Sequence, residues 1–234
     1  MKKQTLALMC SFLARVTAAV PAFGATPNEA ACRKALAAGV RKLVSTVMRE
    51  QARCHEARMQ SGSLAASKTD CNDQGQLPQK SQLKIDKLEA KLDRFAQARC
   101  ADTGVTPSAI GFDVCDVPCE TITIAGFTGQ SSVASCLSCR AESEAAIAIE
   151  AAYGTFPDPP LVGAGSLEIA CQKAAHKALL RHTLTRMNEQ HTCQYLKDLD
   201  NPPAGIGSCC DARPSCSAAL NGSGSARYFV RCNP

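Results

Sequence analysis

Apolar residues recur at helical spacing in the first half of the chain. Residues 28–60 contain no proline and a single glycine, and their apolar stripe consists of Leu36, Val40, Leu43 and Val47. A second stripe, in residues 81–100, consists of Ile85, Leu88, Leu92 and Phe95. Intervals of three and four positions place each set on one face of an α-helix, so both stretches are predicted to be amphipathic helices.

Two cysteines share the apolar face of the first predicted helix. At 1.5 Å per residue, Cys32 and Cys54 are about 33 Å apart and cannot bond to each other. An antiparallel hairpin of the two helices brings Cys100 to the level of Cys32, and it leaves Cys71, in the polar loop, near Cys54. We therefore predict the disulfides Cys32–Cys100 and Cys54–Cys71, each worth about 2 to 4 kcal/mol through loop closure.

The same cysteine pattern occurs a second time. Displacement by 139 positions matches the first three cysteines to Cys171, Cys193 and Cys210. Further matches relate Thr46, Met48, Glu50 and Gln51 to Thr185, Met187, Glu189 and Gln190. This self-similarity predicts a duplicated helical unit rather than a long solenoid.

The second copy has lost part of the apolar stripe. His182 and Arg186 stand where the first copy has leucine and valine, and no complete counterpart of the 81–100 helix follows. A face without a covering helix is expected to be polar. We expect Leu180, Leu184 and Met187, on the opposite side of this helix, to pack against the middle section or the first hairpin.

These patterns predict an all-α protein in five segments. Residues 1–24 form a signal peptide, 25–100 the first hairpin, 101–156 a cysteine-rich middle section with a helix over 131–153, 157–165 a linker, and 166–234 the truncated second unit with a tail rich in glycine and proline.

The signal peptide is predicted from a positive head at Met1 to Lys3, an apolar stretch interrupted by Arg15, and small residues near Gly24. No other stretch approaches the roughly 20 apolar residues of a membrane span. We therefore expect export to a periplasmic, cell-surface or extracellular location. Cys10 would leave with the leader, and the remaining 14 of the 15 cysteines form an even number, as a closed set of disulfides requires.

Charge and aromatic content exclude one class of partner. The formal net charge of +5 falls to about +2 without the leader, so little electrostatic attraction to nucleic acid remains. The chain contains no tryptophan, and only 4% of its residues are aromatic. Few side chains could stack on bases, and no nucleic-acid partner is expected.

Four cysteines of the middle section permit three interpretations. The spacing of Cys115, Cys119, Cys136 and Cys139 is close to that of a tetrahedral zinc site, and Cys136-Leu-Ser-Cys139 has the spacing of a thiol oxidoreductase. We favour disulfides that join Cys115 and Cys119 to Cys136 and Cys139, because export favours oxidation. Zinc is kept as the alternative cofactor, and no other cofactor is expected.

The cysteines of the second unit are assigned in the same way. Cys193–Cys210 repeats a bridge of the first unit, and the remaining predicted pairs are Cys171–Cys232 and Cys209–Cys216.

Two other groups could carry chemistry in principle. His176, His182 and His191 lie on the second ladder helix, but they lack metalloprotease spacing and an evident carboxylate partner. Asp113, Asp116 and Glu120 lie among the middle cysteines, where a solvated loop is the simpler interpretation. No nucleophile elbow, phosphate loop or dinucleotide fingerprint is present, so no catalytic residue is assigned.

The chain resembles a group of exported cysteine-rich helical repeat proteins predicted from bacterial genomes. The resemblance spans roughly residues 27–210 and consists of the cysteine ladder on a long helix, Ile110-Gly111-Phe112 followed by cysteines, Cys136-Leu-Ser-Cys139 leading into a helix rich in alanine and isoleucine, and a second ladder helix. The group has no established activity, so the resemblance implies a fold and export only. Its members often continue with a complete second hairpin, whereas this chain has its own tail.

Three classes of function follow. We favour a non-catalytic exported protein with a structural or binding role, whose partner is an unidentified protein or cell-envelope component. The first alternative is a carrier of lipids or other small apolar ligands, by analogy with disulfide-rich helical proteins that have an adjacent pair such as Cys209-Cys210. The second alternative is a thiol-redox or zinc-binding module at the middle cysteines.

Overall fold

The computed structural model describes residues 25–61, 70–154 and 165–199. Within these residues the chain is helical, and the long helices are α2 (Pro27–Ser61), α4 (Gln79–Arg99), α5 (Val133–Tyr153) and α6 (Ser166–Asp198). The same residues contain no β-strand, only an isolated bridge between Gly126 and Ser132. The predicted all-α class is therefore confirmed, and the helices lie close to the predicted ranges.

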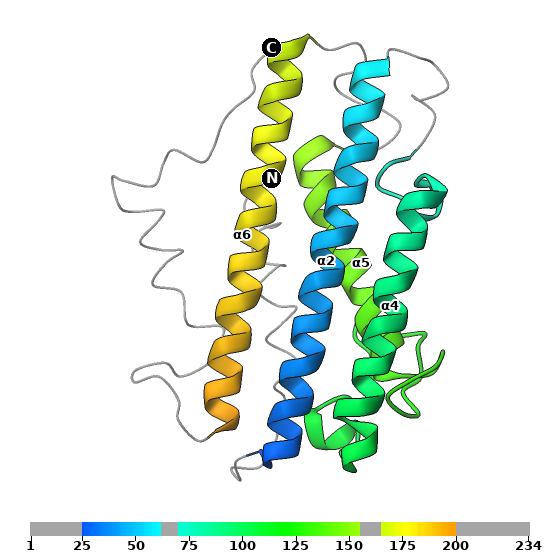
Figure 1. Cartoon of the computed structure of the whole chain (residues 1–234), viewed down its shortest axis with the longest axis vertical. Coiled ribbons are helices and arrows are strands. Elements are labelled where there is room, and N and C mark those ends of the chain that lie inside the picture. Colours follow the sequence, from blue (N-terminus) through cyan, green and yellow to red (C-terminus); the bar gives the residue numbers. More distant parts are fainter. Residues whose placement is uncertain (1–24, 62–69, 155–164, 200–234) are drawn as a thin grey trace.

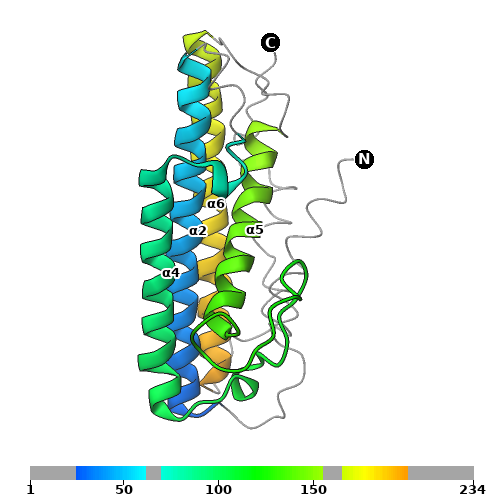
Figure 2. The ribbon, with the colours of Figure 1, turned by 90° about the vertical axis from the view of Figure 1, so that its right-hand side faces the viewer.

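The long helices run alternately up and down, with α2 between α4 and α6 (Figure 1). The view turned by 90° shows α5 on one face of this layer (Figure 2). Helix α2 contacts each of the other three long helices. The arrangement is an antiparallel four-helix bundle in which α2 is the central element.

Local sequence sets the start of the central helix. The hydroxyl of Thr26 accepts a hydrogen bond from the Glu29 backbone N–H at 3.3 Å, and the Glu29 carboxylate accepts one from the Thr26 N–H at 2.8 Å. This reciprocal capping box satisfies backbone donors that an α-helix leaves unpaired. Pro27 occupies the first helical position, where its missing N–H costs nothing.

Helix α2 is buried over more of its circumference than its single apolar stripe predicts. Leu36, Leu43 and Val47 of the stripe are buried, but so are Val44 and Met48, which lie outside it. The reason is tertiary, because three helices pack against α2 from different sides. On α4 the predicted apolar stripe includes one residue that is not buried, because Phe95 has 37% of its surface exposed.

Two apolar clusters fill the bundle. The larger draws buried residues from α2, α4 and α5, and Leu180 and Met187 of α6 pack against it. The smaller lies around the Cys32–Cys100 disulfide, where Ile110, Phe112 and Phe127 of the middle section pack with buried residues of α2 and α4. Segments that the sequence divides into separate units thus share one interior.

Two disulfides cross-link the first hairpin, one towards each end of α2. Cys32 bonds to Cys100 with a Cα–Cα separation of 4.9 Å, and Cys54 bonds to Cys71 with a separation of 5.5 Å. These are the pairings that the antiparallel hairpin predicts. The first lies where α4 ends, and the second ties α2 to the segment that leads into α4.

Polar pairs along the α2–α6 interface set its antiparallel register. Arg33 forms an ion pair with Asp198 at 2.5 Å, and nearer the other end Lys173 pairs with Glu56 at 3.3 Å. Between them, Arg41 donates a hydrogen bond to the side chain of Asn188. His182 is exposed, as expected for the stripe lost in the second copy.

The second copy matches the first in position. Helices α2 and α6 begin at Pro27 and Ser166, the displacement that relates the two cysteine ladders. Cys171 and Cys193 of α6 are disulfide-bonded. The predicted partners Cys210 and Cys232, the Cys209–Cys216 pair, the signal peptide and most of the predicted linker lie outside the described residues.

Candidate functional site

The middle cysteines form two disulfides that pin the loop before α5 to the first turns of that helix. Cys115 bonds to Cys136 and Cys119 to Cys139, with Cα–Cα separations of 5.7 and 6.1 Å. An oxidised Cys-x-x-Cys oxidoreductase instead bonds its two cysteines to each other. The observed pairing is that of the structural interpretation, and it leaves no thiolate among these four residues to bind zinc. Elsewhere in the described residues, no cluster of three or more His, Cys, Asp or Glu is placed to hold a metal ion.

The acidic loop among these cysteines is not uniformly solvated. Asp116 forms an ion pair with Arg140 at 2.7 Å, whereas Asp113 and Glu120 are exposed and do not join it. The Arg140 side chain is buried, and burial lowers its pKa although the Asp116 charge opposes that shift. The Asp116 side chain nevertheless keeps 36% of its surface exposed, so the three acidic residues form no shared site and lie on a largely solvated loop.

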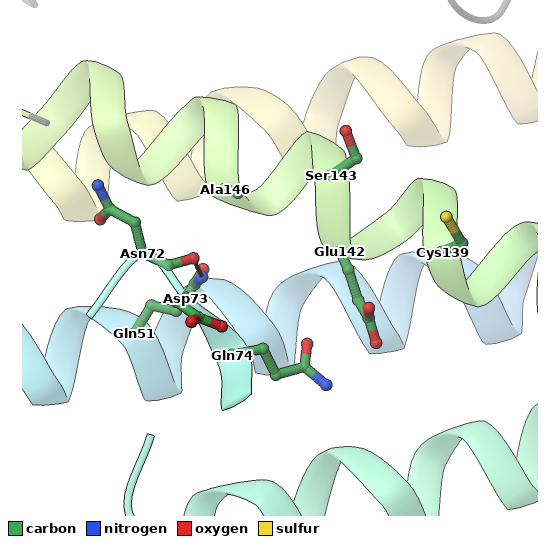
Figure 3. Close-up of a pocket in the computed structure, with 8 residues that line it drawn as sticks. All are labelled: Gln51, Asn72, Asp73, Gln74, Cys139, Glu142, Ser143 and Ala146. Carbon is green, nitrogen blue, oxygen red and sulfur yellow. Dashed lines mark hydrogen bonds between the residues drawn. The ribbon is translucent and has the colours of Figure 1, made fainter. Parts of the chain in front are cut away.

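A cavity of about 270 Å³ lies where α2, residues 72–74 and α5 meet (Figure 3). Its lining is contributed by Gln51 of α2, by the 72–74 segment and by one side of α5. The complete set is Gln51, Asn72, Asp73, Gln74, Cys139, Glu142, Ser143 and Ala146. The Cys54–Cys71 and Cys119–Cys139 bridges hold two of these elements close to the cavity.

Gln51 is a buried polar side chain in the wall of this cavity. Only 1% of its surface is exposed. Its Nε2 donates a hydrogen bond to the Asn72 backbone carbonyl at 2.8 Å, whereas its Oε1 has no hydrogen-bond partner in the described part of the chain. Because an unpaired buried acceptor costs about 1 to 3 kcal/mol, it is unusual in a folded protein.

Glu142 of α5 has a strongly perturbed carboxyl group. Burial raises its pKa to about 8, and the neighbouring carboxylates Glu89 and Asp86 of α4 act in the same direction. Gln74 is hydrogen-bonded to Glu142 and opposes the shift, and the ends of these two side chains approach each other in Figure 3. Burial and the neighbouring carboxylates thus both favour the protonated form of the Glu142 carboxyl.

A second polar cluster lies inside the bundle near the end of α5. The rings of His55 and Tyr153 stack with centroids 4.3 Å apart, and Tyr153 contacts His176 of α6 at 5.8 Å. His55 also forms a hydrogen bond of 2.8 Å with the side chain of Asn72. All three rings are buried, so the cluster joins α2, α5 and α6 through polar side chains.

Burial controls the ionisation of this cluster. It lowers the pKa of His55 to about 4, although the hydrogen bond to Asn72 opposes the shift. Burial also lowers the pKa of His176 and raises that of Tyr153. The three rings are therefore neutral at pH 7, and the cluster holds no charge to bind an ion.

The histidines singled out from the sequence do not form one site. His176 is buried against Tyr153, His182 is exposed, and His191 stacks on Tyr195 with a centroid distance of 6.4 Å. The buried His55 was missed altogether, as were Gln51 and Glu142. No local signal could have found them, because the sequence does not distinguish Gln51 and His55 from exposed polar residues of the same helix such as Arg49 and Arg53.

Comparison of the chain with protein-family models, curated proteins and solved structures finds no match. The site must therefore be interpreted from its own chemistry. None of the helices in the described residues combines the length and apolar character of a membrane-spanning segment. The disulfides are typical of an oxidising, extracytoplasmic environment.

Proposed function

We propose that this chain is an exported, disulfide-braced helical protein whose role is to bind a partner or ligand rather than to catalyse a reaction. The observation that carries the proposal is the position of the bridges beside the cavity. Cys54–Cys71 ties α2 to the 72–74 segment, and Cys119–Cys139 ties α5 to the loop that precedes it. Because such cross-links restrict the frame, the site is preorganised, which reduces the ordering cost of binding.

Two features support the duplicated architecture within this proposal. The α2 and α6 helices begin at equivalent positions of the cysteine ladder, and they pack side by side through the α2–α6 ion pairs. The second copy thus completes the bundle by covering α2. We infer that the chain belongs to the exported bacterial repeat proteins that its motifs resemble.

The alternatives receive less support from the geometry. A lipid carrier needs an apolar cavity large enough to bury an acyl chain, whereas the cavity described above has a volume of about 270 Å³ and its wall includes amide and carboxyl side chains. A thiol-redox or zinc module needs free thiols at the middle section, whereas Cys136 and Cys139 are bonded to separate cysteines of the loop.

Chemical analysis of the protein recovered from the exported fraction tests the proposal. We expect loss of the leader, a disulfide map that contains Cys115–Cys136 and Cys119–Cys139, no thiol that reacts with Ellman's reagent, and no stoichiometric zinc or lipid. The Cys115→Ala/Cys136→Ala variant, in which only Cys119 and Cys139 remain in the middle section, is the control for incomplete oxidation. A Cys136–Cys139 bridge that exchanges with dithiothreitol and reduces insulin would overturn the non-catalytic assignment, and retention in the cytosol with free thiols would overturn export.

A further inference from the structure

The side of α2 that no other helix covers is basic. Three helices pack against α2, and the two views place its open side on the face of the α4–α2–α6 layer opposite α5 (Figure 1, Figure 2). Between positions 31 and 60, the exposed residues of α2 include no aspartate, no glutamate and no large apolar residue. They are Ala31, Ala38, Ala57, Gln60 and the basic residues Lys34, Arg41, Lys42, Arg49 and Arg53. Because the helix has one open side, these residues share it.

Helix α4 adds cations along one edge of this side. Lys84 forms an ion pair with Glu50 of α2 at 2.9 Å. Lys87 and Lys91 follow at intervals of three and four positions, so they lie on the same side of α4 as Lys84. Both helices therefore contribute basic side chains to the boundary between them.

Helix α6 adds cations along the other edge. Lys173 and Asn188 of α6 both contact side chains of α2. Lys177 and Arg181 lie between these two contacts, at intervals of four positions from Lys173, and both are exposed. The basic surface of α2 thus continues onto the helix that belongs to the second copy.

Several of these cations have no ion-pair partner in the described part of the chain. They are Lys42 and Arg49 of α2, Lys87 of α4, and Lys177 and Arg181 of α6. We call the surface marked by these five residues the basic face. Like charges fixed on neighbouring helices repel one another, and a bound anion would remove that repulsion.

Acidic residues gather on the α5 side of the molecule. Asp86 and Glu89 of α4 lie beside Glu142 of α5, and Asp113 and Glu120 are exposed on the loop that two disulfides pin to α5. The fold therefore separates charges that nearly cancel along the sequence. The net charge of about +2 without the leader understates how strongly the basic face attracts anions.

We propose that the basic face binds the anionic phospholipid headgroups of a membrane surface. This inference rests on the proposed export and binding role, and it names the partner of that role. The binding is peripheral and electrostatic, because the exposed positions between the cations of α2 hold small residues such as Ala38. Small residues let the headgroups approach the helix, and they insert no apolar anchor.

The extent of the basic face favours a membrane surface over a single polyanionic strand. From Lys34 to Arg53 the cations of α2 span about 28 Å at 1.5 Å per residue. Packed helix axes lie about 8 to 10 Å apart, so cations on three adjacent helices extend over roughly 20 Å in the other direction. A headgroup layer presents anions in two dimensions, whereas a strand presents them along a line. Between positions 31 and 60, α2 also exposes no aromatic ring on which bases could stack.

Sedimentation of the intact oxidised protein with lipid vesicles tests the proposal. We expect binding to phosphatidylcholine vesicles that contain about 30% phosphatidylglycerol, and none to vesicles of phosphatidylcholine alone. Binding should be strong at about 0.05 M salt and lost at about 0.5 M, because salt screens exposed charges.

Variants locate the surface. A basic residue near an anionic membrane strengthens binding about fivefold. Lys42→Gln/Arg49→Gln should therefore weaken vesicle binding at least about tenfold, and Lys177→Gln/Arg181→Gln should do the same. None of these four residues has an ion-pair partner in the described residues, so circular dichroism spectra and melting curves should match those of the unmodified protein.

A matched control separates the basic face from net charge. Thr121→Glu/Gln130→Glu lowers the net charge by the same two units at exposed positions of the loop before α5. This loop is pinned to α5, away from the basic face. The control should therefore bind vesicles within about twofold of the unmodified protein.

Some results would overturn the proposal. They are equal binding to the two kinds of vesicle, binding that survives the higher salt, or a control that loses as much affinity as the basic-face variants. A DNA duplex that binds more tightly than the vesicles at equal salt would overturn the assignment to a membrane. Failure here is distinguishable from failure of the proposed function, because the disulfide map and thiol titration do not depend on vesicles.

Discussion

His55 should make the protein lose stability in mild acid. Its ring is buried between α2 and α5, with 7% of the residue exposed, and it stacks on Tyr153. Its pKa falls from 6.5 to about 4, chiefly because burial disfavours the charged ring. Arg58 and His176 add to this shift, whereas the hydrogen bond to Asn72 and the charge of Asp70 oppose it.

The sign and size of the effect follow from linkage. Between about pH 6.5 and pH 4 the unfolded chain binds a proton at His55 that the folded chain does not bind. The free energy of unfolding therefore falls as pH falls through this window and is steady below it. A shift of about 2.5 pKa units corresponds to a loss of about 3 kcal/mol from this residue alone.

Glu142 acts in the opposite direction, so the total pH profile cannot isolate His55. Its pKa is raised, so its carboxyl opposes folding increasingly as pH rises from about 4.5 to about 8. The comparison must therefore be between the unmodified protein and His55→Gln, which keeps an amide that can reach Asn72. Subtracting the two profiles cancels the contribution of Glu142.

Urea denaturation followed by circular dichroism measures the difference. The unmodified protein should lose about 3 kcal/mol relative to His55→Gln when the pH falls from about 7 to about 4. A proton NMR titration of the His55 ring gives its pKa directly. A difference profile that is flat in this window, or a ring that titrates above about pH 6, would refute the reasoning.

Three further perturbations test the frame. Replacement of Cys32 and Cys100 by alanine opens a loop with a sequence separation of 68 and should cost about 4 kcal/mol in urea denaturation; an unchanged midpoint would contradict a structural role. Gly39→Leu should lower the melting temperature, at a cost of about 1 to 3 kcal/mol, because even a Cβ atom at Gly39 would lie 2.7 Å from the buried Leu92 Cδ1 atom. Gly39→Ala is the comparison, and its melting temperature should fall less. Ser132→Ala removes the N-cap of α5 and should cost about 1 kcal/mol, with Ser132→Thr, which keeps the hydroxyl, restoring most of it; equal melting temperatures for both variants would contradict the cap.

The apolar stripes predicted α2 and α4, because an apolar face repeated at helical spacing is stable when it is buried against a partner. The bridges Cys32–Cys100 and Cys54–Cys71 followed, since an antiparallel hairpin leaves each cysteine one neighbour at its own level. The capping pair at the start of α2 is likewise a local signal. These features depend on residues close in sequence or on a single hairpin.

The candidate site depended on contacts that no local pattern contains. Gln51 and His55 are ordinary polar residues of a helix until α5 and the 72–74 segment cover them. Glu142 is an ordinary carboxylate until α4 brings Glu89 beside it. Burial and charge proximity are properties of the assembled bundle, and they determine the protonation of Glu142 and His55. The sequence by itself therefore determined the helices and the two disulfides of the first hairpin, whereas only the tertiary structure decided which polar side chains lost water and acquired unusual chemistry.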